Sequence, residues 1–272
     1  MSYSLIDIGA NLAHHTFDED RSDVMQRAAE AGVDKIIVTG SSDASNVQAA
    51  ELAANSAGVL FSTAGVHPHH ASDYTDHSDA LIRSLIQKDV VVAVGECGLD
   101  YFRDLSPREA QLSAFRRQLE IARDSGLPVF LHQRDAHDDF VTVLGEALPD
   151  ISRAVAHCFT GEGESLREYL GLGLYIGITG WICDERRGEH LQDIASNIPD
   201  NRLLIETDAP YLLPRTIRPK PKTRRNEPAY LPEVLRAVAA ARGQSEEHVA
   251  SITSINATRF FGLTCESTPN GA

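Results

Sequence analysis

The sequence predicts one (β/α)8 barrel (a TIM barrel), in which eight parallel strands form a closed sheet inside a ring of helices. Short apolar runs alternate with helical patterns along the whole chain of 272 residues, as expected for parallel strands buried on both faces. No linker or change of composition interrupts the series, and α/β barrels often reach about 250 residues as one domain. Four of the runs end on a residue that can bind a metal, which suits the strand-end active sites of barrel enzymes.

The strands are expected where a short apolar run lies between two turn-like stretches. In chain order these ranges are Leu5–Ile8, Lys35–Thr39, Leu60–Ala64, Val90–Gly95, Pro128–His132, Arg153–His157, Leu174–Ile178 and Arg202–Glu206. Helical patterns separate consecutive strands, and two further helices follow the last strand. The expected helices are Arg21–Ala31, Asp43–Asn55, Asp79–Gln87, Pro107–Ser125, Asp138–Ala147, Gly163–Leu170, Glu189–Ser196, Leu231–Arg242 and Ser245–Phe261. The fourth helix has the clearest ends, with Ser106 as the expected N-cap and Gly126 after its last turn.

We expect one domain over residues 1–265 and a frayed tail over residues 266–272. A doubly wound open sheet is the alternative fold. It is disfavoured because no GxGxxG motif follows the first strand, and Gly171, Gly173 and Gly177 do not have that spacing.

Composition narrows the class of protein. The net charge of −14 excludes a general attraction of the surface to nucleic acid or to an anionic membrane, so a polyanionic substrate would need a local basic patch. The N-terminal segment has no basic stretch before a long apolar one, and no run approaches about 18 apolar residues, so we expect neither a signal peptide nor a membrane span. The four cysteines have no CxxC spacing and suit a reducing compartment. We expect a cytoplasmic enzyme that does not enter membranes and acts as a monomer.

Four polar residues at strand ends are the candidate metal ligands. Glu96, His132, His157 and Asp208 end the fourth, fifth, sixth and eighth apolar runs. Each alone has a common structural explanation, such as a hydrogen-bonded histidine or an aspartate that caps a helix. Parallel strands all finish on the same rim, and buried charges rarely persist unpaired, so the four together predict a metal-dependent active site.

Longer motifs surround these residues and resemble those of one known family. The segments AGVHPHH, VGECGLDYFRD, LPVFLHQRDAH, HCFTG, YIGITGWICDERRG and IETDAPYLLPR are similar to motifs of the TatD family of metal-dependent deoxyribonucleases. The resemblance covers nearly the whole chain and implies a TIM barrel that binds a divalent metal and hydrolyses phosphodiesters, as a 3′–5′ exonuclease on single-stranded DNA and RNA. It also implies that Glu96, His132 and His157 bind the metal and that Asp208 is essential.

The chain departs from the family at its first strand. Most members have an HxH pair there, whereas this sequence has Gly9 and Asn11 at the two histidine positions. Glycine has no side chain that can bind a metal, and the amide oxygen of asparagine is a weak ligand. We therefore expect one firm metal site and a second that is weak or absent. The resemblance implies Mg²⁺ or Mn²⁺, whereas two imidazole ligands would also suit Zn²⁺.

Glu96 and Asp208 are the expected catalytic residues. A bound divalent metal would polarise a phosphoryl oxygen and lower the pKa of a bound water, giving a nucleophile near neutral pH. Glu96 would hold the metal, and Asp208 could take the proton from that water or orient it.

Further residues are expected to contact or orient the substrate: His67, Asp100, Arg134, Arg215, Arg224 and Arg225. Arg134 could bind a phosphate bidentately, and Asp100 could orient a histidine or a water. The segment Arg215–Arg225 concentrates six cations after the eighth strand and suits a single-stranded nucleic acid. The structural alternatives are a loop-fixing role for His67, a salt bridge between Arg134 and Asp135, and a solvated basic loop. Aromatic residues that could stack on bases follow several strands: Tyr101, Phe102, Phe159, Trp181 and Tyr211.

Two other functions stay open at this point. One is a metal-dependent ester or amide hydrolase on the same scaffold, for example one that acts on aminoacyl-tRNA. The amidohydrolase version is disfavoured because the HxH pair and a lysine on the fourth strand are both absent. The other is a noncatalytic nucleic-acid-binding relative, which would have no reason to keep the four polar groups together.

Overall fold

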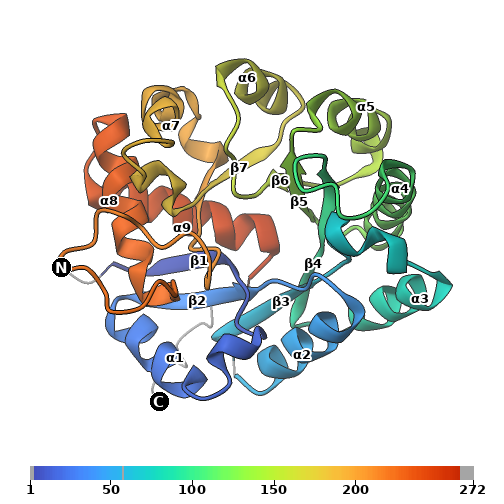
Figure 1. Cartoon of the computed structure of the whole chain (residues 1–272), viewed down its shortest axis with the longest axis horizontal. Coiled ribbons are helices and arrows are strands. Elements are labelled where there is room, and N and C mark those ends of the chain that lie inside the picture. The colour runs from blue at the N-terminus through green and yellow to red at the C-terminus, as the bar shows by residue number, and fades with distance from the viewer. Residues whose placement is uncertain (1–2, 57, 264–272) are drawn as a thin grey trace, which may run out of the picture.

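The computed structural model describes residues 3–56 and 58–263, and these residues form the predicted barrel. Eight strands lie side by side in chain order, each parallel to the next (Figure 1). Their bounds are β1 Leu5–Ala10, β2 Val33–Val38, β3 Leu60–Ala64, β4 Val91–Asp100, β5 Val129–Arg134, β6 Ala154–Ala156, β7 Tyr175–Ile178 and β8 Leu203–Ile205. β8 returns beside β1, where one bridge pairs Ala10 with Ala209. The predicted frayed tail lies outside the described residues.

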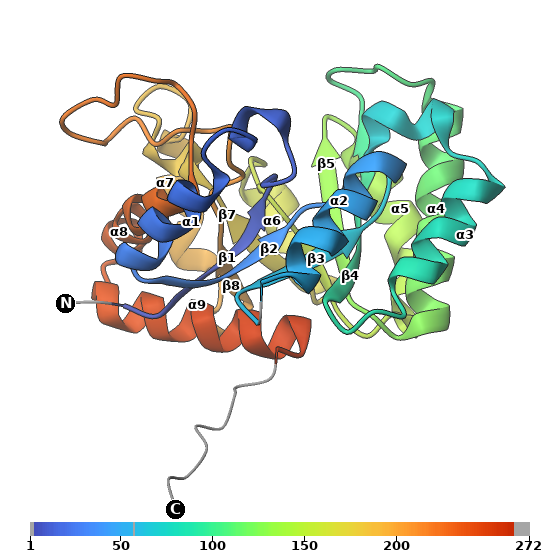
Figure 2. The same cartoon turned by 90° about the horizontal axis from the view of Figure 1, so that it is seen from below.

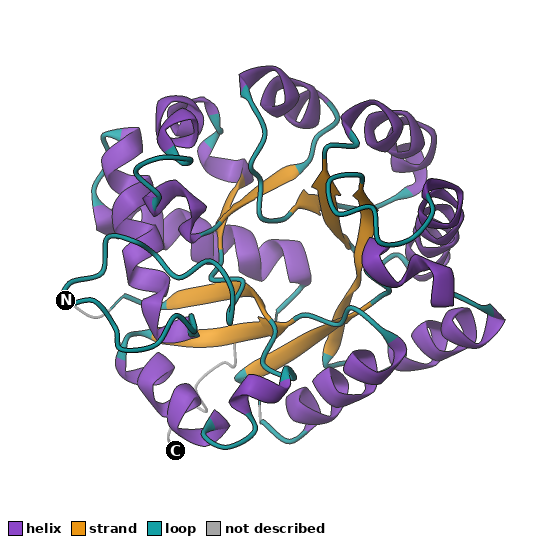
Figure 3. Ribbon diagram, in the orientation of Figure 1, coloured by secondary structure: helices purple, strands orange, loops and turns teal. Residues whose placement is uncertain are grey.

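Helices surround the outer face of the sheet (Figure 3). Their bounds are α1 Arg21–Glu30, α2 Asp43–Ala54, α3 Asp76–Leu85, α4 Arg108–Ser125, α5 His137–Ala147, α6 Gly163–Gly171, α7 Glu189–Ile194, α8 Leu231–Arg242 and α9 Glu246–Phe261. All the predicted helices are present, and most ends lie within two residues of the prediction. Within the described residues, no helix is both long and apolar enough to cross a membrane.

Two helix starts were predicted wrongly. α3 begins at Asp76 rather than at residue 79, because the hydroxyl of Thr75 caps it. The N-cap of α4 is Pro107, and the predicted cap, Ser106, has another role. The buried Ser106 hydroxyl donates to the carbonyl of His69 and accepts from the backbone N–H of Ser72. Ser106 therefore fixes the loop after β3 instead of starting a helix.

β4 differs most from its predicted range and carries a functional consequence. It continues to Asp100 instead of ending at Gly95, so Glu96 lies inside the strand. The pairing with β5 slips at this point, since Gly95 is opposite Phe130 while Cys97 is opposite Leu131. Glu96 is the extra residue of this β-bulge, and bulges re-aim a side chain near active sites.

The apolar interior has two parts. The larger cluster fills the space between the strands and the surrounding helices. The smaller one fills the barrel itself and includes Ile6, Phe130 and Tyr175 together with Phe260 and Phe261 of α9. The rings of Tyr175 and Phe260 lie 5.1 Å apart. α9 thus closes the N-terminal end of the barrel, below the strands in Figure 2.

The seam between β1 and β8 is held by one buried carboxylate. Asp7 accepts hydrogen bonds from the backbone N–H of Thr207 at 2.9 Å and of Gly9 at 3.3 Å, and from the Thr207 hydroxyl. Burial raises the pKa of Asp7 to about 7, although these hydrogen bonds oppose the shift. Backbone hydrogen bonds from Asp208 to Gly9 and from Asn11 to Ala209 also cross the seam, so Asp7 extends a short ladder between the two strands.

Candidate metal centre

A cavity of about 660 Å³ opens at the C-terminal ends of the strands. Its lining includes all four predicted ligands, Glu96, His132, His157 and Asp208. Since these residues come from four different stretches of the chain, only barrel closure brings them to one place.

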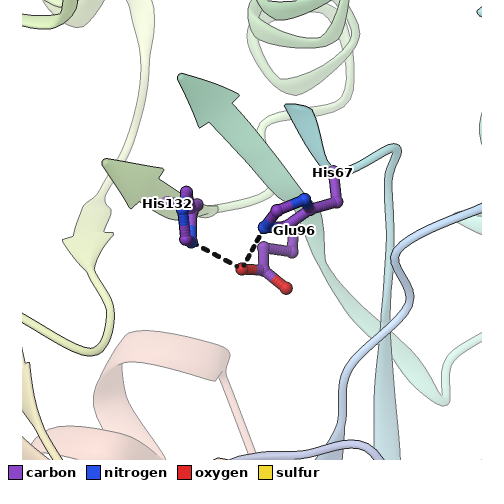
Figure 4. Close-up of side chains that lie close together, drawn as sticks. All are labelled: His67, Glu96 and His132. Atoms are coloured by element: carbon purple, nitrogen blue, oxygen red, sulfur yellow. Dashed lines mark ion pairs between the residues drawn. The ribbon is translucent and has the colours of Figure 1, made fainter. Parts of the chain in front are cut away.

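Three imidazole rings surround a single oxygen of Glu96. Oε1 lies 2.7 Å from Nε2 of His157, 3.1 Å from Nδ1 of His132 and 3.4 Å from Nε2 of His67. His67 and His132 point at this carboxylate from either side (Figure 4). The sequence placed His67 among the substrate contacts, whereas the structure places its ring beside the metal-ligand candidates.

The carboxylate and the imidazoles of this cluster shift each other's protonation. Burial alone would raise the pKa of Glu96, but His67, His157 and His132 hold it well below its usual range. Burial would lower the pKa of His157, yet Glu96 and Glu206 hold it well above its usual value. Burial brings the pKa of His67 well below its usual value. Because metals bind neutral imidazole, a cation would have to displace a proton from His157, whereas the low pKa of His67 leaves that ring neutral.

Asp100, the last residue of β4, also lines the cavity and lies beside two of the histidines. Its Oδ2 is 2.8 Å from Nε2 of His69 and 3.4 Å from Nε2 of His132, and Oδ1 accepts from the backbone N–H of Arg103. Burial would raise the pKa of Asp100, but its close contacts with His132 and His69 hold it well below its usual range. Asp100 is therefore placed to orient His132. The contact of His69 with it was not expected from the sequence.

Asp208 reaches the cavity from the loop after β8. Its Oδ1 accepts a hydrogen bond of 3.2 Å from the amide of Asn11, the residue that replaces the second histidine of the family pattern. Burial raises the pKa of Asp208 to about 8. Asn11, whose amide oxygen would be a weak metal ligand, thus contacts Asp208 instead.

One buried acid near the site has no counterpart among the predictions. Glu206 lies just after β8, is fully buried, and approaches Nδ1 of His157 at 3.3 Å. The sequence carried a weak signal, an acid two residues before Asp208. The inward direction of the Glu206 side chain and its contact with His157 depend on how β8 is aligned with β7 and β1, and the sequence does not reveal this alignment.

Arginine and aromatic side chains line one wall of the cavity. The guanidinium of Arg134 lies 4.1 Å from the centre of the Phe102 ring and 5.6 Å from that of Trp181. Arg187 stacks on Trp181 at 4.5 Å. Phe102 is 55% exposed, so one ring edge or face meets solvent. Among the described residues no carboxylate, Asp135 included, lies within 4.0 Å of the Arg134 guanidinium.

The basic loop is not brought into this cavity. Arg215 pairs with Glu185 at 2.9 Å, and Arg225 pairs with Asp20 at 2.6 Å. Arg224 is exposed, and none of the three lines the cavity. Acids outside the loop therefore offset the charge of two of its six cations, and the predicted substrate contacts stay a prediction.

The residues present fit a divalent cation. One atom each from His67, Glu96 and His132 lies within 4.8 Å of the other two. Nε2 of His132 is buried and makes no hydrogen bond of good geometry among the described residues. Imidazole nitrogens combined with a carboxylate suit Zn²⁺, Mn²⁺ or Co²⁺ better than Mg²⁺, which prefers oxygen ligands.

Comparisons with known proteins agree with this geometry. Residues 6–262 match the family described as TatD related DNase. The chain is 49% identical over 259 residues to the 3′-5′ ssDNA/RNA exonuclease TatD of Erwinia amylovora, covering 95% of this chain and 100% of the relative. It is 50% identical over 257 residues to the protein of the same name from Dickeya dadantii, covering 94% and 97%.

Solved structures give the same result. A TatD homologue from Escherichia coli has a TM-score of 0.88 at 30% identity, covering 97% of this chain and 100% of that one. A TatD family hydrolase from Entamoeba histolytica has a TM-score of 0.86 at 28% identity, with the same coverage. The predicted family is confirmed: this chain belongs to the TatD-related DNases.

Proposed function

We propose that the protein is a metal-dependent 3′–5′ exonuclease that acts on single-stranded DNA and RNA. The observation that carries the proposal is the convergence of three imidazoles on the Glu96 carboxylate inside a cavity walled by arginine and aromatic side chains. The relatives named as such exonucleases match this chain over 94–95% of its length.

Glu96, His132 and His157 would hold the cation, with Asp208 beside them and His67 as a further candidate ligand. A divalent cation there would polarise a phosphoryl oxygen and lower the pKa of water; we propose Mg²⁺ or Mn²⁺, with Zn²⁺ also compatible. One cation is proposed, because Gly9 offers no ligand and the amide of Asn11 already donates to Asp208.

Asp208 is the proposed proton acceptor. Its carboxylate lines the cavity, and a cation held by Glu96 and the histidines would favour the ionised form, which can accept a proton. The hydrogen bond from Asn11 fixes one oxygen and leaves the other for a reacting water. Glu96 would bind the cation with its carboxylate, which the three histidines already contact.

A single strand is favoured over a duplex by the wall of the cavity. Bases stack on aromatic rings without sequence preference, and Phe102 and the half-exposed Tyr211 both line the cavity. Arg134, held flat against Phe102, is placed to contact a phosphate. The predicted phosphate contacts of Arg215, Arg224 and Arg225 are not part of this proposal.

We further propose that residues 1–265 act as one catalytic domain in a cytoplasmic monomer. The described cysteines, Cys97, Cys158 and Cys183, are unpaired, as is usual in a reducing compartment. Light scattering coupled to gel filtration would measure the mass in solution, and a dimer would contradict the monomer.

The test uses single-stranded DNA labelled separately at each end. Purified protein is incubated with it in EDTA or with Mg²⁺, Mn²⁺ or Zn²⁺, beside Glu96→Ala as the matched control. We expect a metal-dependent ladder that shortens from the 3′ end and is absent in the variant. If no metal supports cleavage, although the protein binds metal, the nuclease proposal is wrong, and aminoacyl-tRNA and small esters become the next substrates to assay.

A further inference from the structure

Glu206 is a fully buried carboxylate with no part in the function proposed above. Its Oε2 lies 3.3 Å from Nδ1 of His157, and its Oε1 accepts a hydrogen bond of 2.6 Å from the backbone N–H of Cys158. On the other side of the same imidazole, Nε2 lies 2.7 Å from Glu96. The ring of His157 is thus held between two acids, of which only Glu96 lines the cavity.

Two glycines on the neighbouring strands make room for this carboxylate. A Cβ atom at Gly9 of β1 would lie 2.3 Å from Oε2 of Glu206, and one at Gly177 of β7 would lie 2.7 Å from Oε1. Both distances are shorter than a carbon–oxygen contact allows. Any other residue at either position would therefore push the Glu206 carboxylate away from His157.

We propose that Glu206 is a positioning residue that keeps the proton of His157 on Nδ1 and so leaves the lone pair of Nε2 for a divalent cation. An ionised carboxylate can only accept hydrogen bonds, so the ring nitrogen that faces it must donate. Acids that hold the far nitrogen of a metal-binding histidine fix its tautomer and its orientation. The inference rests on the proposed function to the extent that His157 is taken to be a metal ligand.

Glu206→Gln separates this role from simple packing, because the amide has nearly the same size. The N–H of Cys158 still needs an acceptor, so the amide oxygen stays on that side and the amide NH₂ faces Nδ1 of His157. The amide then donates to Nδ1, and the proton of the ring moves to Nε2. The nitrogen that faces the cavity becomes a donor and can no longer bind a cation.

The matched control is Glu227→Gln. Glu227 is also buried, and it pairs with Arg27 at 2.7 Å, but it does not line the cavity. It reports what removing a buried negative charge does to the fold in general. Both variants and the parent are stripped with EDTA and titrated calorimetrically with Mn²⁺ and, separately, with Zn²⁺.

We expect Glu206→Gln to bind either cation about 10- to 100-fold more weakly than the parent, while Glu227→Gln binds as the parent does. In the metal-free parent both ring nitrogens of His157 face an acid, so nitrogen-15 NMR should show protons on Nδ1 and Nε2, and the proton on Nδ1 should be lost in Glu206→Gln. Equal cation affinity in parent and Glu206→Gln, or a proton that stays on Nδ1 in the variant, would overturn the inference.

A variant that fails to fold is replaced by Gly9→Ala, which keeps Glu206 but crowds its carboxylate; unchanged affinity there also overturns the role. A parent that binds cation but cleaves no nucleic acid contradicts the exonuclease and leaves the comparison of affinities intact. A parent that binds neither cation contradicts both proposals.

Discussion

Arg134 shows how much a single side chain in the cavity can determine. Its guanidinium rests on Phe102, and no described carboxylate within 4.0 Å neutralises it. Most arginines that contact acids in this chain do so at the surface, as Arg215 does with Glu185. A charge left without an acid partner beside the candidate metal ligands is available to a phosphate.

Arg134→Gln should raise the KM for a single-stranded oligonucleotide about 10-fold or more, since hydrogen bonds to charged groups contribute about 1.5–3 kcal/mol. Hydrolysis of bis(p-nitrophenyl) phosphate, which has no second phosphate to bind, should keep its rate. Arg167→Gln, on the exposed face of α6, is the charge-matched control. An unchanged KM for the oligonucleotide would remove Arg134 from the substrate path.

The sequence revealed those site residues whose position follows from chain order alone. Glu96, His132, His157 and Asp208 each end an apolar run, and parallel strands place such ends on one rim. Glu206 could not be found in this way, because its partner depends on how β8 is aligned with β7 and β1. The bulge that turns Glu96 inward is likewise a matter of register with β5.

The β1–β8 seam depends on Asp7, and its protonation should make the seam sensitive to pH. Burial raises the pKa of Asp7 from 3.8 to about 7, a difference equivalent to about 4 kcal/mol. The folded pKa is above the unfolded value, so the contribution of Asp7 to stability is complete below pH 4 and is lost as pH rises towards 7.

Asp7→Asn cannot titrate, so its free energy of unfolding should fall less than that of the parent between pH 4 and pH 7. Urea titrations of both proteins across this range measure the two slopes. Parallel curves would show that Asp7 does not carry the pH dependence, whatever the absolute stabilities of the two proteins.

α9 was predicted as a helix, but nothing in its sequence indicated where it would pack. The structure places Phe260 and Phe261 against the strands inside the barrel. Apolar residues on an added helix fit an outer layer as well as a plug, so periodicity could not distinguish the two.

Phe260→Ala should lower the free energy of unfolding by about 3–5 kcal/mol, the usual cost of removing a buried phenylalanine ring. The cavity lies at the opposite end of the barrel, so the exonuclease rate at low temperature should stay close to that of the parent. Ile255→Ala, an exposed position on the same helix, serves as the control. A loss below about 1 kcal/mol would mean that the end of the barrel is not closed by this ring.

The whole chain carries a net charge of −14 and yet must receive a polyanion. The cations that line the cavity are Arg103, Arg134 and Arg187, and Arg187 is partly neutralised by Asp184 at 3.0 Å. Each phosphate contact with a single strand contributes about 0.7 to the slope of log affinity against log salt. We therefore expect the nucleic acid to be attracted weakly and only near the cavity, rather than across a broad positively charged face.

We expect a slope of about −1 to −2 for single-stranded DNA in EDTA, measured by fluorescence anisotropy between low and moderate salt. The double variant Arg215→Gln/Arg225→Gln should leave the slope unchanged, because acids already pair with both side chains. A slope of about −4 or steeper that falls in the double variant would restore the basic loop as a binding surface.

The fold of the molecule was the part most fully predictable. Alternating strand and helix patterns, uniform composition and strand-end polar residues each pointed to one closed barrel, and the described residues form it. The role of the basic loop was less accessible, since a run of arginines looks the same whether acids from elsewhere in the chain meet it or not. Asp20 lies about two hundred positions before Arg225 and yet pairs with it.

The closure of one barrel end by α9 sets the route of the products. Because Phe260 and Phe261 fill the N-terminal end of the barrel, the described residues leave no channel through its core. A nucleic-acid strand can reach the cavity only from the C-terminal side of the sheet. Strand and released nucleotide would therefore both have to pass over the rim formed by the loops after the strands, where a second cavity adjoins the first and shares Arg134, Trp181 and Arg187 with it.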